Sequence, residues 1–276
     1  MKKILLVLVL MMVTAPAIIA QEKIKGDRNV TIRQTYIDDF ETIVVDGDFS
    51  IEIVYNSKPS VNVEADDNLH DVIQFDVVDG VLTFVETTRI TSKKKLNITV
   101  NYGDALRNIE TRRDGEIRSL TSMELIDATL TTSDNSRAYL NIKTTNFLYK
   151  SSGKSKTRLN LTADSTKIEL SDNSKLDALI NSKVADFDLY QRSDLSIEGA
   201  ANNSVIRLIN SSNFNGGKFD VKTTDVSLED SSDLTLSVNE SITIASSGDS
   251  EIYLYGSPEI TITKFDDTSK LQKKKR

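Results

Sequence analysis

The chain has 276 residues, of which 38% are apolar and 27% charged, and its formal net charge is −7. This composition suits a folded β-rich protein better than an intrinsically disordered chain. Cysteine is absent, which excludes disulfides, thiol chemistry and a lipid anchor on cysteine, and the acidic balance disfavours nucleic acid as a partner.

Residues 1–20, MKKILLVLVLMMVTAPAIIA, have the layout of a secretory signal peptide, with a basic start, an apolar run and a small residue at the end. We expect cleavage after Ala20, which removes Lys2 and Lys3 and changes the net charge from −7 to −9. The alternative is an N-terminal membrane anchor, for which the apolar run is short. No later segment is apolar enough to span a membrane, so none is expected after cleavage.

Residues 21–35 are expected to form a loose N-terminal segment or a cap. Alternating apolar and polar stretches such as VDGDFSIEIVYN and LNITVNYG follow, broken by Asp46-Gly47 and Asp79-Gly80, which are strong turn signals. We interpret these stretches as the wider first coils of a stack that continues through the later repeats. One parallel β-helix domain is therefore predicted for residues 36–265.

A serine recurs along the second half of the chain at intervals of 19, 19, 19, 19, 20 and 18 residues. The seven serines are Ser136, Ser155, Ser174, Ser193, Ser212, Ser232 and Ser250. A constant period of this length is the signature of a repeat architecture. Apolar residues keep register with it: six positions before each serine stand Leu130, Tyr149, Ile168, Phe187, Ile206, Val226 and Ile244.

Short runs with a period of two, repeated at this spacing, predict an all-β fold. A single repeat cannot bury its apolar face, whereas stacked repeats can, with each strand paired to its equivalent in the next coil. We therefore predict a single-stranded parallel β-helix, with coils of about 19 residues and the serines as one corner column. Asn135, Asn173 and Gly153 are the expected left-handed residues of that corner. The terminal KLQKKKR is expected to be a frayed, solvated end within a basic tail, residues 266–276.

The first part of the chain resembles the putative auto-transporter adhesin, head GIN domain family. The resemblance rests on ordered segments: Gly26 to Asn29, Asp39-Phe40, Val45 to Gly47, Val63 to Leu69 and Val77 to Leu82. It covers roughly residues 26–220. The resemblance implies a right-handed parallel β-helix, secreted by Bacteroidetes-type bacteria, with an adhesive or envelope role and no recognised catalytic residues.

Two sets of outward residues are candidates for ligand binding. Arg137, Lys156 and Lys175 each follow a corner serine, so stacking predicts a short cationic strip on consecutive coils. Tyr253 and Tyr255 alternate with apolar residues and are expected to point outward together, where they could stack on sugar rings or fill a protein interface. The alternatives are a solvated charged face for the strip and, for the tyrosines, shielding of the open end.

Residues suited to catalysis are sparse. His70 is the only histidine and follows a turn, so we expect a solvated surface side chain. Asp134 and Asp172 share a column but lie two coils apart, about 9.6 Å at strand spacing, which is too far to share one calcium ion. Neither a metal site nor a cofactor is predicted.

These observations favour an exported binding or adhesion module of the cell envelope without catalytic activity. Its location would be the periplasm, the outer-membrane surface or the medium, and its partner a cell-surface glycan or an envelope protein. The alternative is a polysaccharide-active enzyme, a lyase or hydrolase, built on a β-helix. A third possibility is a stack that serves as a spacer or shield.

Overall fold

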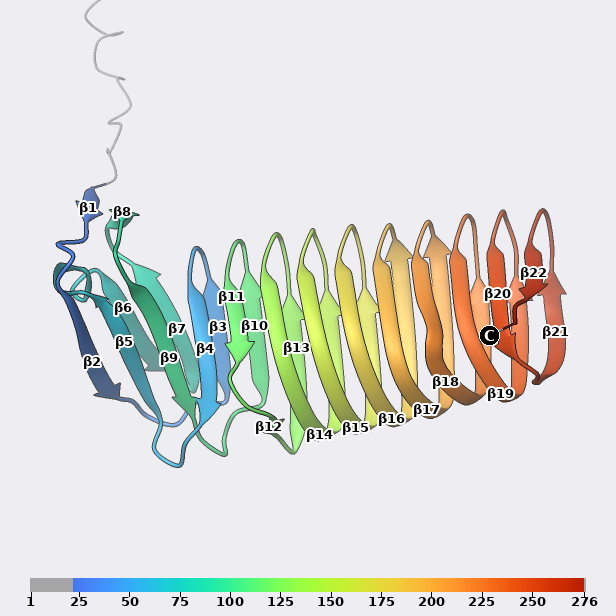
Figure 1. Ribbon diagram of the computed structural model, residues 1–276, viewed down its shortest axis with the longest axis horizontal. Helices are drawn as coiled ribbons and strands as arrows, with labels where there is room; N and C mark the ends of the chain where they lie inside the picture. Colours follow the sequence, from blue (N-terminus) through green and yellow to red (C-terminus); the bar gives the residue numbers. More distant parts are fainter. Residues whose placement is uncertain (1–21, 276) are drawn as a thin grey trace, which may run out of the picture.

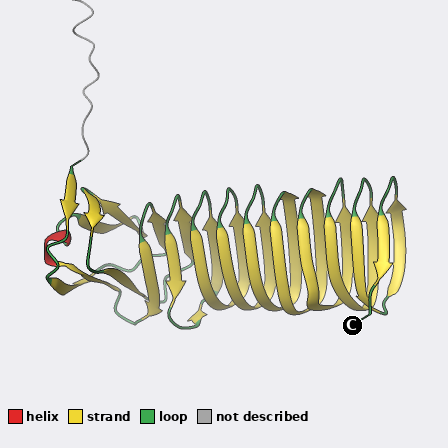
Figure 2. Cartoon of the chain, turned by 45° about the horizontal axis from the view of Figure 1, so that its top comes forward, coloured by secondary structure: helices red, strands yellow, loops and turns green. Residues whose placement is uncertain are grey.

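The computed structural model describes residues 22–275, which form a long stack of β-strands (Figure 1). The signal peptide expected at residues 1–20 lies outside the described residues. Helical structure within the described part is limited to the 3-10 turn η1 (Asp67–Leu69), drawn red in Figure 2. No helix in residues 22–275 combines the length and apolar character needed to cross a bilayer. The predicted all-β parallel solenoid is confirmed.

Long strands bent near their middle make up the regular part of the stack. They are β14 (Arg137–Ser151), β15 (Lys156–Leu170), β16 (Lys175–Gln191), β17 (Asp194–Asn210), β18 (Asn213–Leu228) and β19 (Asp233–Ser246). Each pairs in parallel with the next, and Arg137 lies opposite Lys156, which in turn lies opposite Lys175. The first halves of these strands form what we call the first face of the solenoid, and the second halves form the second face.

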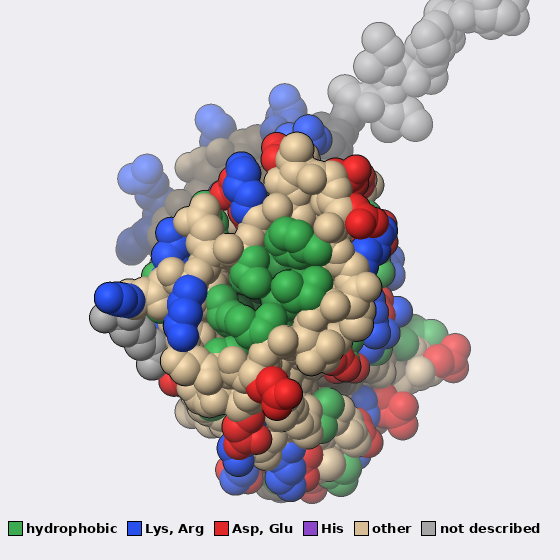
Figure 3. Space-filling view, turned by 90° about the vertical axis from the view of Figure 1, so that its right-hand side faces the viewer, with side chains coloured by type: hydrophobic (Ala, Val, Ile, Leu, Met, Phe, Trp, Pro, Cys, Tyr) green, Lys and Arg blue, Asp and Glu red, His purple; other side chains and the backbone are tan. Residues whose placement is uncertain are grey.

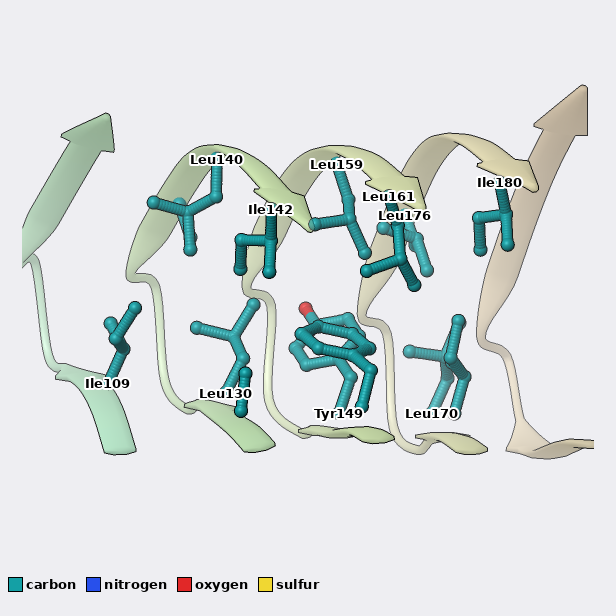
Figure 4. Packing of buried hydrophobic residues seen from close by; sticks show 14 of the residues in the cluster. Ile109, Leu130, Leu140, Ile142, Tyr149, Leu159, Leu161, Leu170, Leu176 and Ile180 are labelled. Atoms are coloured by element: carbon teal, nitrogen blue, oxygen red, sulfur yellow. The ribbon is translucent and has the colours of Figure 1, made fainter. Parts of the chain in front are cut away.

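The core lies between the two faces, because successive side chains of a strand point to opposite sides. Figure 4 shows Leu140 and Ile142 of the first face directed toward Leu130 and Tyr149 of the second. All four side chains are at most 4% exposed. The apolar columns recognised in the sequence are therefore the columns that fill the interior.

The corner before each first-face strand has a constant backbone conformation. Two positions before each serine the residue is left-handed: Asp134, Gly153, Asp172, Gln191, Asn210, Asp230 and Gly248, with φ between 59° and 78°. The expectation was correct for Gly153 but wrong for Asn135 and Asn173, which each lie one position too late. Asp and Asn tolerate this region because their short side chains bond locally to the backbone.

The left-handed column is held by side-chain bonds between coils. Carboxylates accept hydrogen bonds from the backbone N–H of the left-handed residue one coil earlier: Asp134 from Arg113 (2.9 Å), Asp172 from Gly153 (2.8 Å) and Asp267 from Gly248 (2.9 Å). The serines that follow are at most 1% exposed and turn inward. Several close the corner by donating to the carbonyl three residues back, as Ser174 does to Ser171 (2.7 Å).

Shorter strands form the first coils. They are β3 (Thr42–Asp46), β4 (Ser50–Tyr55), β10 (Asn108–Arg112), β11 (Glu116–Ser119), β12 (Met123–Glu124) and β13 (Asp127–Thr132). β4 and β11 extend the first face, while β3, β10 and β13 extend the second, all with parallel pairing. For these strands the interpretation as early coils of the same stack is correct.

The strands that precede these coils in space combine parallel and antiparallel pairing. They are β1 (Lys23–Lys25), β2 (Val30–Tyr36), β5 (Ser60–Asp66), β6 (Ile73–Val78), β7 (Val81–Glu86), β8 (Arg89–Ser92) and β9 (Leu96–Tyr102). β5 pairs antiparallel with β2 and β9, and β6 pairs antiparallel with β7. The expectation of wider parallel coils is correct for β7 and β9, which pair in parallel with β3 and β4. It is wrong for β2, β5 and β6, whose antiparallel pairing continues the two faces as a cap. β1 and β8 pair in parallel as a separate two-stranded sheet of this cap.

The last coils consist of β20 (Glu251–Gly256), β21 (Glu259–Phe265) and β22 (Lys270–Lys273). β21 pairs in parallel with β19, and β22 pairs in parallel with β20. The expectation of a frayed end is therefore wrong for Lys270–Lys273, because the edge of β20 offers backbone partners even to a lysine-rich segment.

Candidate functional site

A shallow hollow of about 810 Å³ runs across the first face from β11 to β18. We call it the lateral groove. Its walls include the outward side chains of Arg118, Tyr139, Arg158, Asp177, Leu179 and Glu198. These positions alternate with the buried residues of the same strands, so the period that builds the core also sets these side chains in columns on the surface.

An aromatic ring and an exposed leucine give the lateral groove its apolar character. The guanidinium of Arg118 lies 4.3 Å from the centroid of the Tyr139 ring, a cation–π contact. Leu179 is 44% exposed, although it sits in a regular strand. Between them Asn141 and Asn160 are in register on adjacent coils and line the same hollow. The surface therefore combines a stacking ring, an apolar contact and amide hydrogen-bonding groups.

Ion pairs across the lateral groove are long or exposed. Arg158 Nε lies 3.8 Å from Asp177 Oδ2, with both side chains more than two-thirds exposed. Lys218 Nζ lies 2.9 Å from Glu198 Oε1 and is also largely exposed. Exposed pairs of this kind contribute little to stability, about 0–1 kcal/mol each. Their charged groups remain accessible to a ligand.

The predicted cationic strip lies beside the lateral groove. Arg137, Lys156 and Lys175 are exposed and lie in register on consecutive coils. Arg137 Nη1 lies 3.8 Å from Glu116 Oε2, and Lys175 Nζ lies 3.8 Å from Asp194 Oδ2. A second hollow of about 230 Å³ is lined by Lys156, Lys175 and also by groove residues such as Tyr139 and Arg158. The strip and the groove thus form one continuous surface.

The two tyrosines lie toward the other end of the same face. Tyr253 and Tyr255 are part-buried and alternate with buried core residues. The Tyr253 hydroxyl donates to Glu251, which raises the pKa of that phenol, and Lys274 Nζ lies 4.3 Å from its ring centroid. Tyr255 lies over Gly217 of the lateral groove, where an added Cβ would come within 3.4 Å of its ring. Tyr255 therefore reaches the groove, whereas Tyr253 is held by its contacts with Glu251 and Lys274.

Sequence reasoning missed Arg118, Tyr139, Arg158 and Leu179. Tyr139 and Arg158 stand three positions after a corner serine, in an outward column that shows no constant chemistry along the chain. Arg118 lies on β11, upstream of the regular serine series, so the period does not align it with Tyr139.

His70 lies away from this surface, in the cap, and its expected solvation is wrong. The side chain is buried, with Nε2 3.0 Å from the Thr31 hydroxyl, which also contacts Asp67 Oδ1 at 2.9 Å. Burial lowers the pKa of His70, so the ring is neutral near pH 7. It borders a cleft of about 510 Å³ that Arg33 also lines.

Acidic residues of the solenoid are not gathered for metal binding. In residues 22–275 no three histidine, aspartate or glutamate side chains are placed to hold an ion. Asp134 and Asp172, the acids considered for calcium, instead accept backbone hydrogen bonds at the corner. Their position is explained by the left-handed turn they stabilise.

Comparison with known proteins agrees with this architecture. The family described as "Putative auto-transporter adhesin, head GIN domain" matches residues 39–258. The chain belongs to this family. The resemblance noted in the sequence is confirmed, and membership of this adhesin family supports a binding role for the chain.

Solved structures show the same fold at low sequence identity. A putative adhesin from Parabacteroides distasonis is 18% identical with a TM-score of 0.62, covering 91% of this chain and 100% of that one. A putative adhesin from Parabacteroides merdae is 15% identical with a TM-score of 0.60, covering 91% and 99%. A putative lipid binding protein from P. distasonis is 16% identical with a TM-score of 0.59, also covering 91% and 99%. Among curated proteins none matches.

Proposed function

We propose that the chain is an exported, non-catalytic module of the cell envelope that binds an anionic glycan along the lateral groove. This proposal rests on one observation: the Tyr139 ring lies beside the cations Arg118, Arg158 and Lys156 on one open surface. Membership of the adhesin family supports a binding role.

The chemistry of the groove suits an acidic sugar chain. A sugar ring can stack against the half-buried ring of Tyr139, which lines the groove, as aromatic side chains do with amphipathic ligands. Arginine presents a planar fork of donors that matches a carboxylate or a sulfate. Asn141 and Asn160 offer amide donors and acceptors for hydroxyl groups. The side chains recur at about 4.8 Å from coil to coil, so an extended ligand lying along the solenoid axis meets several of them.

Export rests on residues 1–20. A signal peptide would release a mature chain beginning at Gln21 in the periplasm, at the outer surface or in the medium. N-terminal sequencing of the protein from the envelope and the medium tests this. A chain that still begins at Met1 would contradict removal of the segment.

Glycan binding is tested by calorimetry with an oligouronate and with a neutral oligosaccharide of equal length. We expect binding of the oligouronate alone, and a loss of about tenfold or more in affinity for Arg158→Glu and for Tyr139→Ala. The pair Arg137→Glu with Lys156→Glu should also weaken binding, and this effect should shrink at high salt, because exposed charges are screened. Tyr255→Ala tests the far end of the groove.

Lys150→Glu is the matched control, because Lys150 lies in the second half of β14 on the opposite face. It should leave the affinity unchanged, and circular dichroism should show that all variants are folded. Equal binding by wild type, Arg158→Glu and Tyr139→Ala would remove the groove from the site. Capture of an acidic protein instead of a glycan would assign the same surface to a protein partner.

A further inference from the structure

Within residues 22–275 the C-terminal end of the solenoid is open. Ile260, Ile262 and Phe265 of β21 are 42%, 51% and 39% exposed. Their register partners one coil earlier, including Ile242 and Ile244, are at most 1% exposed. Figure 3 views this end and shows hydrophobic side chains uncovered at its centre. The end therefore presents a cross-section of the core to its surroundings.

Unpaired strand edges surround this apolar centre. Within residues 22–275, β22 pairs only with β20, and β21 pairs only with β19. The N–H groups of Lys270 and Lys274 bond back to the preceding coil, at 2.9 and 2.8 Å. Backbone groups alternate in direction along a strand, so those of Leu271 and Lys273 face the free edge, where they can template a further strand.

The free edge of β22 is strongly basic. Lys270, Lys273, Lys274 and Lys275 lie on or just after this strand. Lys270 is paired with Glu251 at 2.7 Å. Lys273 stands in register with Leu254, a core position, and its Nζ reaches Ser257 at 3.1 Å. A lysine in an inward column disfavours indiscriminate edge pairing, and it favours a partner that supplies negative charge.

We propose that this end binds an extended, acidic strand of a protein partner, which adds to the free edge of β22 as the next rung of the first face. Such a strand would pair its backbone with Leu271 and Lys273 and turn apolar side chains toward the exposed centre. Its carboxylates would meet the lysines of the edge. This mode of recognition takes affinity from main-chain hydrogen bonds and specificity from alternate side chains.

Other occupants fit these observations less well. A lipid surface would cover the apolar centre but would leave the backbone groups of both edges without partners. A second copy meeting this end through a twofold axis would bring the lysine-rich segment against its own equivalent, and like charges at strand spacing repel. An acidic strand satisfies the backbone groups of the β22 edge, the apolar centre and the lysines together.

The test uses the full chain and two labelled peptides of about ten residues, one alternating valine with glutamate and one alternating valine with lysine. Fluorescence anisotropy should show binding of the glutamate peptide, at least about tenfold tighter than that of the lysine peptide. Raising the salt concentration should weaken binding, because the edge charges are exposed. Arg158→Glu, in the lateral groove, should leave peptide binding unchanged.

Two variants of Lys273 separate backbone pairing from charge. K273Q removes only the charge and should weaken binding about threefold, whereas K273P also removes the outward N–H and should weaken it about tenfold. The N–H of Lys273 makes no bond to β20, so proline is compatible with the edge strand. Circular dichroism checks that both variants are folded.

Each contrary outcome is decisive. Binding of neither peptide, equal binding of both, or equal affinities of K273P and K273Q would overturn the proposal. A dimer in sedimentation velocity that Ile262→Lys dissociates would assign the end to a second copy instead. Binding to anionic phospholipid vesicles that the same variant abolishes would assign it to a lipid surface.

Discussion

The two ends of the solenoid stop the same repeating structure in opposite ways. At the N-terminal end each face continues through one more parallel strand, β9 or β7, and then into antiparallel strands, β5 and β2 on one side and β6 on the other. At the C-terminal end both faces stop at parallel strands. The consequence is visible in exposure: Leu69 of the cap is fully buried, whereas Ile262 of the last coil is 51% exposed. Reversing strand direction closes a stack that parallel pairing leaves open.

One carboxylate ties the cap together. Asp66 is buried and accepts hydrogen bonds from the backbone N–H groups of Arg28 (3.3 Å), Lys94 (3.0 Å) and Lys95 (3.2 Å). Gly26 packs against it so closely that an added Cβ would overlap the carboxylate. The Gly26 to Asn29 and Val63 to Leu69 segments, noted in the sequence as separate motifs, are therefore one structural unit. The last coil has no equivalent among the described residues.

The largest expected effect on stability comes from comparing two single variants, each of which places a charge in the same column but in a different, neighbouring coil. Ile244→Asp should lower the free energy of unfolding by about 4 kcal/mol or more, because it buries an unpaired carboxylate. Ile262→Asp, one coil later in register, should cost less than about 1 kcal/mol, because that side chain is half exposed. Urea unfolding of both variants measures the difference.

Ile168→Asp and Leu195→Asp, which lie at fully buried positions in the middle of the stack, should behave like Ile244→Asp. Equal stability of the Ile244 and Ile262 variants would mean that the last coil is covered in solution, and the contrast between the ends would fail.

Acid should open the N-terminal cap before the middle of the stack. The N–H groups of Lys94, Lys95 and Arg28 hold the pKa of Asp66 below its usual 3.8. The stabilisation is therefore complete above the usual value and is lost as the pH falls through the lowered one. Hydrogen exchange, read as protection factors, should show β2 and β5 opening below about pH 3.8 while β15 and β16 remain protected.

Asp66→Asn is the matched variant, because it keeps the shape but loses the charge. It should loosen the cap at neutral pH and remove the acid-dependent step. Simultaneous opening of β2 and β15 in the wild-type protein would show that Asp66 does not control the cap separately from the stack.

The smallest effect is expected at the corner column. Asp172→Ala leaves alanine in a left-handed conformation and removes the acceptor of the Gly153 N–H, a cost of about 1–2 kcal/mol. Asp267→Ala makes the same change in the last coil, for the Gly248 N–H. It should cost less than half as much, because a terminal coil opens locally before the whole stack unfolds.

Glycine at either position keeps the backbone conformation and serves as the control in the same urea titration. Asp172→Gly should be closer to wild type than Asp172→Ala. If alanine and glycine behave alike, the left-handed backbone contributes nothing measurable at this corner.

The repeat predicted the stack well because a constant period fixes both register and burial. The 19-residue spacing of the serines is the offset that pairs Arg137 with Lys156. The one interval of 20 residues, from Ser212 to Ser232, marks an irregularity: the pairing register shifts beside Gly216. There an added Cβ would come within 2.6 Å of the Phe214 ring, so the chain has room only for glycine at this irregularity.

The cap could not be predicted by the same reasoning. Side chains alternate identically in parallel and antiparallel strands, so the pattern does not reveal strand direction. Asp46-Gly47 joins β3 to β4 as a coil corner, whereas Asp79-Gly80 joins β6 to β7 as an antiparallel hairpin. In the hairpin both residues have positive φ, 50° and 74°, while in the corner only Gly47 does. The same dipeptide makes both turns, and the surrounding packing decides between them.

The lateral groove was predicted only at its border. The sequence identified the cationic strip because its residues adjoin the serines, but the Tyr139–Arg118 contact joins strands from regular and irregular parts of the chain. The contact between Arg118 and Tyr139 can be recognised only once β11 is paired with β14 in three dimensions. The outward residues of the groove vary from coil to coil, whereas the core columns repeat apolar residues, so the repeat predicts the core better than the candidate site.

The pairing register is unbroken from β14 to β17, so the number of coils in this part could change without disturbing the two ends of the molecule. Excising residues 156–174 would join Ser155 to Lys175, the residue already aligned with Lys156, and the coils on either side would meet in register. The rod would shorten by one strand spacing, about 4.8 Å, while the cap and the open end kept their form. Duplicating the same segment would lengthen it by as much. Deletion or duplication of one 19-residue segment would therefore change the length of the rod in uniform steps without altering either end.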